Sequence, residues 1–151
     1  MTDIPCCDDL VSVVMPTHNR ADRLMWALRS VLDQDHRSIE VIVVDDGSRD
    51  RTREVLAAVD DPRLRPIHLS PNGGVAAARN AGIAAATGRW VAFIDDDDFW
   101  LPTKLSAQIA AMRSTGARWC IASALEVTPS LEPLAFAHVS PGMTSEWLLG
   151  S

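Results

Sequence analysis

The stretch IEVIVVDDGS, residues 39–48, decides the fold. Its first six residues are nearly all apolar and mostly β-branched, which is typical of a strand covered on both faces of a parallel sheet. The acidic pair Asp45-Asp46 follows at once, and Gly47-Ser48 come next. The pattern indicates a buried strand that ends in polar residues at the edge of a sheet.

Short apolar runs alternate with helical patterns on both sides of this strand. VSVVM, which stops at Pro16, is a second continuous apolar strand, and the following apolar residues recur at helical spacing. The spacing predicts strands at 11–15, 39–44, 64–69, 90–94 and 119–127, with helices at 21–34, from Ser48 to about 59, at 75–87 and after Pro102. This order predicts an α/β fold: an open, mainly parallel, Rossmann-like sheet with helices on both faces.

Single residues suggest where some elements begin, end and lie. Ser48 is a plausible N-cap for the second helix, and Gly88 a plausible C-cap for the third. Pro66 removes a donor from the 64–69 strand, which places that strand at an edge. The helix at 75–87 is rich in small residues and is expected to pack closely against its neighbours.

Composition excludes several classes of protein. The chain has 151 residues, 47% of them hydrophobic, and a net charge of −6, so a nucleic-acid backbone is an unsuitable partner. The acidic start lacks the regions of a signal peptide, and no apolar run is long enough to span a membrane. Three cysteines without metal spacing favour a reducing compartment, and we expect a cytoplasmic location.

Polar clusters follow three of the expected strands. They are PTHNR at 16–20, DDGS at 45–48 and four aspartates at 95–98. In open α/β sheets, ligands bind in the crevice beyond the carboxyl ends of the strands, where these clusters meet. The aspartate run could be a solvated acidic turn, but its apolar lead-in and the following Phe99-Trp100 favour a ligand site at the edge of a core.

The chemistry of four carboxylates favours a hard divalent cation. Sites rich in oxygen and without His or Cys suit Mg²⁺ or Mn²⁺, and Mg²⁺ typically uses one or two carboxylates together with substrate phosphates. If the strand geometry continues, Asp95 and Asp97 share one face, and Asp96 and Asp98 share the other. A metal-bridged diphosphate is therefore a suitable ligand.

Other motifs fail. The chain has neither G-x-G-x-x-G nor G-x-x-x-x-G-K-[ST], which argues against ordinary dinucleotide binding and a P-loop. A signalling receiver would explain VIVVDDGS, but it needs a phosphoacceptor aspartate after the next strand, where HLSPNGG stands. A phosphohydrolase nucleophile motif fails because Phe99 occupies the required Thr or Val position.

Three stretches in order resemble the family 2 glycosyltransferases of the GT-A fold. They are VSVVMPTHNRADRL, VIVVDDGSRDRT and PNGGVAAARNAGIAAATGRWVAFIDDDDFWLPTKL, which together span about residues 11 to 105. The resemblance implies transfer of a sugar from a nucleotide-diphosphate donor, with inversion at the anomeric carbon and with Mn²⁺ or Mg²⁺ as cofactor. UDP is the default nucleotide, because it is the commonest in the family.

The resemblance also implies roles for individual residues. Those matching the nucleotide-binding positions are Pro16, Thr17, His18, Asp46, Arg79 and Asp95, and those matching the metal site are Asp97, Asp95 and Asp98. Plainer interpretations stay open. His18 is alternatively a polar loop residue, and Arg79 a solvated residue or a partner of Asp95. Asp96 is expected to be solvated or to cap the helix after Trp100.

The resemblance further implies an incomplete enzyme. We expect a tail at 1–10, a nucleotide-sugar-binding domain at 11–128 and the start of an acceptor-side region at 129–151. The family's general base is expected beyond Ser151, so the chain alone would be inactive, and exposed apolar surface would favour a homo-oligomer. The alternative is a non-catalytic nucleotide-sugar-binding or regulatory module; the acceptor is open.

Overall fold

A computed structural model describes residues 9–127 and 133–137. The chain divides into two compact units after Ser106, a division that the sequence patterns do not predict. The first unit contains four strands and three helices. Helix α4 (Lys104–Thr115) runs across the division, and the second unit also contains strands β5 and β6.

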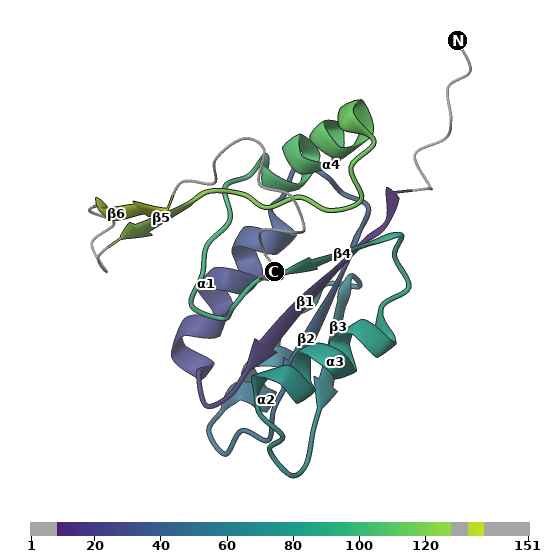
Figure 1. Ribbon diagram of the computed structural model, residues 1–151. Coiled ribbons are helices and arrows are strands. Elements are labelled where there is room, and N and C mark those ends of the chain that lie inside the picture. Colours follow the sequence, from purple (N-terminus) through teal and green to yellow (C-terminus); the bar gives the residue numbers. More distant parts are fainter. Residues whose placement is uncertain (1–8, 128–132, 138–151) are drawn as a thin grey trace, which may run out of the picture. The chain divides into compact units, whose positions relative to one another are not determined.

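The first unit is built on a parallel sheet with strand order β3-β2-β1-β4 (Figure 1). Strands β1 (Val11–Thr17) and β2 (Ile39–Asp45) are central and buried at every position. Strands β3 (Leu64–His68) and β4 (Trp90–Phe93) lie at the two edges. The predicted α/β class, the four strands and the edge position of the proline-containing strand are all confirmed.

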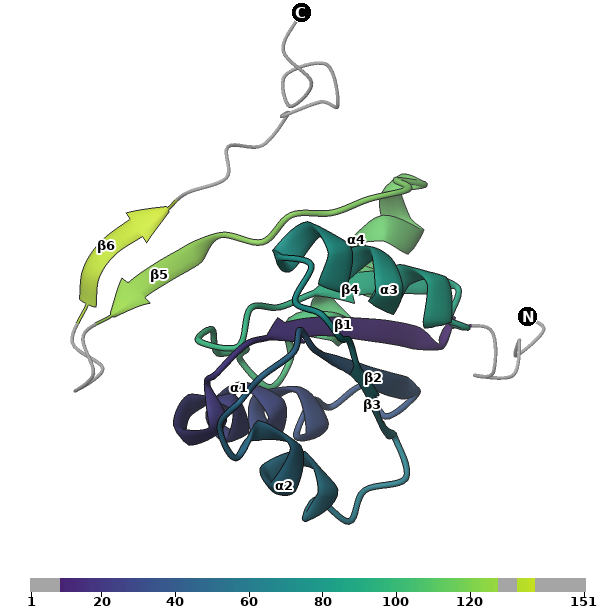
Figure 2. The ribbon, with the colours of Figure 1, turned by 90° about the horizontal axis from the view of Figure 1, so that it is seen from below.

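The helices cover both faces of this sheet (Figure 2). Helices α1 (Ala21–Leu32) and α2 (Thr52–Ala57) lie on one face, and α3 (Val75–Ala85) packs on β1 and β2 from the other. The chain moves outward from β1 to β3 and then crosses to β4 on the opposite side of β1. The gap between the carboxyl ends of β1 and β4 is therefore the point where the strand order reverses, the usual ligand position in such sheets.

Helix α3 packs against the sheet at very short range, as its small residues predict. A Cβ added at Gly82 would lie 2.4 Å from Val14 Cγ1, so only glycine permits this approach. Ala78, fully buried, joins Ile42 and Val44 in one apolar cluster. The short approach fixes α3, and with it the loop that precedes it, relative to the ends of β1 and β2.

Two predicted caps are wrong. Helix α2 begins at Thr52, because Asp50 Oδ1 accepts from the Thr52 amide and hydroxyl, whereas Ser48 lies in the preceding turn and donates its amide to Asp45 Oδ1. Helix α3 ends at Ala85, before Gly88. A Cβ at Gly88 would lie 2.5 Å from the Leu10 carbonyl oxygen, so this glycine permits close passage beside the start of β1.

The predicted strand at 119–127 is also partly wrong. Only Ala124–Val127 forms a strand, β5, and it pairs antiparallel with β6 (Pro133–Ala137) in a separate two-stranded sheet. The apolar run 119–127 resembles a buried parallel strand in composition, but composition does not determine which partner supplies the backbone hydrogen bonds.

A buried carboxylate that sequence reasoning missed lies at the amino-terminal end of the sheet. Glu40 Oε1 accepts from Ser12 Oγ at 2.6 Å and from the Thr87 amide and hydroxyl, while Oε2 pairs with Arg65. Burial raises the pKa of Glu40, but these hydrogen bonds outweigh it and lower the pKa to about 2. The network joins β1, β2, β3 and the segment that leads into β4.

No helix within residues 9–127 and 133–137 is long and apolar enough to cross a bilayer. The first eight residues of the expected tail, with Cys6 and Cys7, and most of the expected region at 129–151 lie outside the described residues.

Candidate functional site

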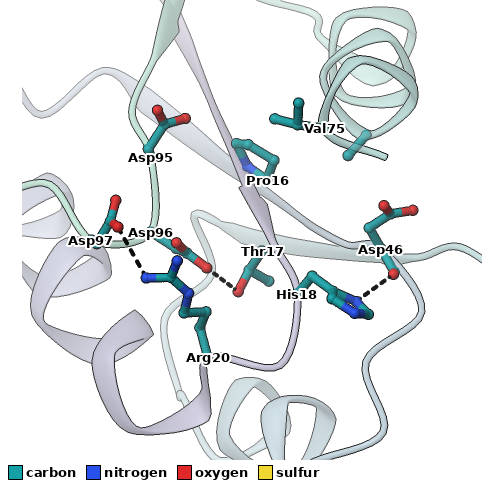
Figure 3. A pocket seen from close by; sticks show the side chains of 10 residues that line it. Pro16, Thr17, His18, Arg20, Asp46, Val75, Asp95, Asp96 and Asp97 are labelled. Carbon is teal, nitrogen blue, oxygen red and sulfur yellow. Dashed lines mark hydrogen bonds and ion pairs between the residues drawn. The ribbon is translucent and has the colours of Figure 1, made fainter. Parts of the chain in front are cut away.

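A pocket of about 300 Å³ lies at the carboxyl ends of β1, β2 and β4 (Figure 3). Its walls come from three strand ends and from the start of α3. They are formed by Pro16, Thr17, His18, Arg20, Asp46, Val75, Ala78, Asp95, Asp96 and Asp97. The sequence-predicted meeting of the three polar clusters at one edge of the sheet is thus confirmed.

The end of β1 is hydrogen-bonded to the aspartate run. Thr17 Oγ1 donates to Asp96 Oδ2 at 2.7 Å, and Asp96 is only 8% exposed. The expectation that Asp96 is solvated is therefore wrong, because its backbone position turns the side chain inward toward β1. Burial raises its pKa, against the opposing effects of the Thr17 hydrogen bond and the Arg20 charge.

The segment after the aspartates is fixed by α1 and the turn that follows it. The Trp100 amide donates to Ser30 Oγ at 3.1 Å. Gln34, fully buried, donates to the Leu101 carbonyl at 2.7 Å and accepts from the Leu105 amide at 3.0 Å. Both ends of the aspartate run are thus held by buried polar contacts, and the run has a defined backbone path.

The carboxylate of Asp46 holds the loop that precedes α3. Its Oδ1 accepts from the Gly73 amide at 2.8 Å and its Oδ2 from the Gly74 amide at 2.7 Å. His18 Nδ1 donates to the Asp46 carbonyl at 2.8 Å, which leaves Nε2 to accept from Asn19 Nδ2. Both nitrogens of His18 are thus engaged within the protein, and its ring is held against the pocket wall (Figure 3).

Asp45, the first acid of the pair, stabilises the turn at residues 45–48 from within the core. It is fully buried, and its oxygens accept from the Ser48 amide, from Arg53 Nε at 3.1 Å and from His68 Nδ1 at 3.0 Å. Burial raises the pKa of Asp45, but these donors together lower it to about 2. Adjacent acids therefore differ: Asp45 is internal, and Asp46 lines the pocket.

The two remaining pocket carboxylates are paired with arginines. Arg20 Nη1 lies 3.0 Å from Asp97 Oδ2, and Arg79 Nη2 lies 2.6 Å from Asp95 Oδ1. All four side chains are roughly half exposed. Arg79 Nε is buried and has no hydrogen-bond partner among the described residues, so the hydrogen bonding of this guanidinium is incomplete in the free protein.

Asp95 and Asp97, the carboxylates at the rim of the pocket, have the chemistry to bind a divalent cation. In the described part of the chain, no three His, Cys, Asp or Glu side chains converge to hold a metal by themselves. Each ion pair uses only one oxygen of Asp95 or Asp97. One or two carboxylates completed by substrate phosphates are typical of Mg²⁺, so these residues fit a cation that arrives with a phosphorylated ligand.

The structure brings together most of the predicted site residues. Arg79 contacts the site through Asp95. Asp98 is the exception, because it is exposed and not part of the pocket wall. Although the residue is exposed, desolvation of its carboxyl by surrounding atoms, together with the charges of Asp95 and Asp97, raises the pKa of Asp98.

Four pocket residues received no individual binding role from the sequence: Arg20 and Asp96, which lie within the predicted polar clusters, and Val75 and Ala78, which do not. The position of Arg20 directly after a strand-end loop is a signal that could have identified it. Val75 and Ala78 resemble ordinary helix residues, and the sequence does not show that the start of α3 faces the pocket.

Comparison with known proteins identifies a family whose model matches most of the chain. The model of the family described as glycosyl transferase family 2 matches residues 12–134. Among curated proteins, the succinoglycan biosynthesis protein ExoO of Rhizobium meliloti (strain 1021) is 44% identical over 108 residues, which cover 72% of this chain and 31% of that protein.

Two solved structures extend the likeness to the fold. S. aureus TarS 1–349 in complex with UDP is 31% identical, with a TM-score of 0.65, over 69% of this chain and 32% of that one. The mannosyltransferase PcManGT of Pyrobaculum calidifontis, in complex with GDP-Man and Mn²⁺, is 29% identical with a TM-score of 0.63, over 68% and 32%. The chain thus spans about a third of the length of these proteins.

Proposed function

The chain belongs to glycosyl transferase family 2, and on this premise we propose that it holds the donor-binding half of an inverting, metal-dependent glycosyltransferase. The donor is a nucleotide-diphosphate sugar, with UDP as the nucleotide. The acceptor is not identified, because the pocket accounts only for the donor.

The observation that carries the proposal is the composition of the pocket wall. The wall has an apolar part, with Pro16, Val75 and Ala78, and a charged rim with Asp95 and Asp97, each of which has an arginine beside it. A planar base suits the apolar side, and a diphosphate suits a rim where cations and carboxylates alternate. The UDP complex of TarS, a protein of similar fold, supports UDP as the first nucleotide to test.

The proposed roles follow from the contacts. Pro16, Thr17 and His18 line the base and ribose, and Asp46 serves the same subsite by fixing the amides of Gly73 and Gly74. Both oxygens of Asp46 are thereby occupied, so its effect on the base includes positioning of this loop.

Arg79 would contact the base or the phosphates. Its buried, unpaired Nε supports this role, because an unsatisfied donor is costly and a rearranged guanidinium would recover the hydrogen bond.

Asp97, with Asp95 and Asp98 in support, would hold Mn²⁺ or Mg²⁺ together with the donor diphosphate. The bound ion would supply charge neutralisation as the nucleoside diphosphate departs. The Mn²⁺ in the PcManGT complex supports the choice of metal. Asp95 alternatively contacts the ribose.

We expect this chain alone to bind donor without transferring sugar. Transfer needs a general base that is free to take the acceptor proton. Asp46 and Asp96 accept hydrogen bonds within the protein, and Asp95 and Asp97 would be engaged by the metal in the donor complex. An assay for UDP release from UDP-sugars, with and without acceptor mixtures, separates this expectation from an active enzyme.

The test is calorimetric titration with UDP, GDP and dTDP, each with and without Mn²⁺. We expect one nucleotide, UDP, to bind in the presence of Mn²⁺ and binding to be lost in Asp97→Ala. Asp22→Ala is the matched control, because Asp22 is a highly exposed acid that pairs with Arg51 at 3.4 Å and is not part of the pocket wall.

Equal binding with and without Mn²⁺ would contradict the metal role. No binding of any nucleotide by the folded wild-type chain would contradict the donor site itself.

A further inference from the structure

In the function proposed above, Arg20 counts only as the charge beside Asp97, and it is given no specific task although it lines the pocket. It is the last residue before α1, and its side chain lines the pocket from the β1 side. Its guanidinium Nη1 lies 3.0 Å from Asp97 Oδ2, with the two side chains 41% and 48% exposed (Figure 3). Because both partners are partly exposed, the ion pair is only weakly stabilising.

The ion pair involves the same carboxylate that is proposed to bind the metal. A divalent cation at Asp97 would lie a few ångströms from the guanidinium, and charges of +2 and +1 repel at that distance even in water. Cation binding therefore requires either that Arg20 remain as an unfavourable neighbour or that it leave Asp97.

The pocket offers Arg20 a second partner when the donor is bound. A nucleoside diphosphate brings phosphate oxygens to this rim, and guanidinium groups bind phosphate oxygens well. Arg20 reaches the rim from the β1 side, whereas Arg79 reaches it from α3 and pairs with Asp95 at 2.6 Å. Phosphate would thus relieve the repulsion that a cation alone creates.

We propose that Arg20 couples metal binding to donor binding. In the free protein it holds Asp97 and weakens the binding of a divalent cation alone. With the diphosphate present it releases Asp97 and pairs with phosphate, so cation and nucleotide bind cooperatively. The inference rests on the proposed donor site, and it makes Arg20 a diphosphate-binding residue that also controls access of the cation to Asp97.

The test measures Mn²⁺ affinity by electron paramagnetic resonance, with and without UDP, for the wild type and for Arg20→Met. Removal of a half-exposed competing charge should tighten binding of Mn²⁺ alone on the order of fivefold. The factor by which UDP strengthens Mn²⁺ binding should fall by a similar amount, and by linkage the effect of Mn²⁺ on UDP falls equally.

Three further variants sharpen the test. Arg20→Lys keeps the charge and should stay near wild type in both measurements. Arg20→Gln is a second neutral variant in case Arg20→Met folds poorly, as judged by circular dichroism. Arg51→Met is the matched control, since it removes an arginine from the exposed pair with Asp22 and should change neither affinity.

The inference is overturned if neither neutral variant binds Mn²⁺ alone more tightly than the wild type, including the case in which none of them binds it. It is also overturned if UDP strengthens Mn²⁺ binding equally in all variants. The donor site is judged separately, by UDP binding to the wild type. If the wild type binds UDP only with Mn²⁺ but the neutral variants keep the wild-type Mn²⁺ affinity, the donor site stands and the role of Arg20 is refuted.

Discussion

The hydroxyl of Thr17 lies 2.7 Å from a carboxylate oxygen of Asp96, although 79 positions separate the two residues in the chain. This hydrogen bond joins the end of β1 to the loop after β4, across the point where the strand order reverses. It is a direct side-chain link between the two elements that form the base and metal sides of the proposed donor site.

Thr17→Val should therefore destabilise the protein and disturb the pocket. The isosteric change leaves buried Asp96 without its hydroxyl donor, and an unsatisfied buried group costs about 1–3 kcal/mol. Urea denaturation measures the loss, and a UDP titration measures the effect on the site. Thr17→Ser keeps the donor and should lose less than about 1 kcal/mol; equal losses in both variants would show that the methyl group, not the hydrogen bond, is what matters.

Asp46→Asn should loosen the loop before α3. Asparagine keeps one oxygen acceptor, but its NH₂ group cannot accept, so one of the amides of Gly73 and Gly74 loses its partner. We expect a loss of about 1–3 kcal/mol and faster hydrogen exchange confined to these two amides.

Asp60→Asn is a suitable control for Asp46→Asn, because Asp60 is exposed and lies outside the pocket wall. Unchanged exchange at Gly73 and Gly74 in Asp46→Asn would mean that the carboxylate does not hold the loop.

Stability should fall on acidification because of Glu40. Its pKa is about 2 in the folded protein, below the ordinary value of 4.5. An acid with a lowered folded pKa stabilises the fold fully above its unfolded pKa. That contribution is lost as the pH falls from about 4.5 toward 2. By linkage, Glu40 should account for about 2 kcal/mol of the free energy of unfolding lost between about pH 6 and pH 3.

Glu40→Gln should be less stable near neutral pH but should lose less stability on acidification. Urea denaturation at both pH values measures the difference. Some acid sensitivity should persist, because the pKa of Asp45 is also lowered, from 3.8 to about 2. The control is Glu54→Gln, at an exposed position of α2, which should keep the wild-type pH dependence of stability. A wild-type pH dependence in Glu40→Gln would show that the Glu40 network does not cause the acid sensitivity.

Gly82→Ala should destabilise the protein, although alanine is the better helix former by about 1 kcal/mol. The new Cβ would lie 2.4 Å from Val14 Cγ1, and Val14 is fully buried with a stiff side chain. Overpacking of this kind costs about 1–3 kcal/mol. Thermal unfolding of Gly82→Ala, Val14→Ala and the double variant gives the coupling, and the double variant should be more stable than the sum of the two losses predicts.

The sheet and its flanking helices could be predicted from the sequence because the local patterns agree with the fold. Buried strands such as 39–44 show as apolar runs, and Pro66 marks an edge strand. The strand at 119–127 could not be predicted correctly, since pairing depends on which backbone lies beside it. Ser48 and Gly88 were misassigned because each has the composition of a helix cap but makes a contact that depends on the tertiary structure.

The site could be predicted as far as the strand ends, and no further. Parallel strands bring their carboxyl ends together, so the meeting of residues 16–18, 46 and 95–97 follows from topology. The direction of each side chain does not. Asp96 turns inward to Thr17, and Asp46 directs both oxygens to backbone amides, because those donors are supplied by segments distant in sequence.

The Glu40 network lies at the opposite end of β1 and β2 from the pocket. Glu40 pairs in register with Ser12, near the start of β1, whereas Thr17 and Asp45 pair at its end. Thr17 lies five positions after Ser12, so the two sites are roughly 17 Å apart, a distance over which substitutions usually act additively. One end of the same two strands can therefore be engineered to adjust thermal tolerance while the other is engineered for ligand preference, and the gains can be combined in a single chain.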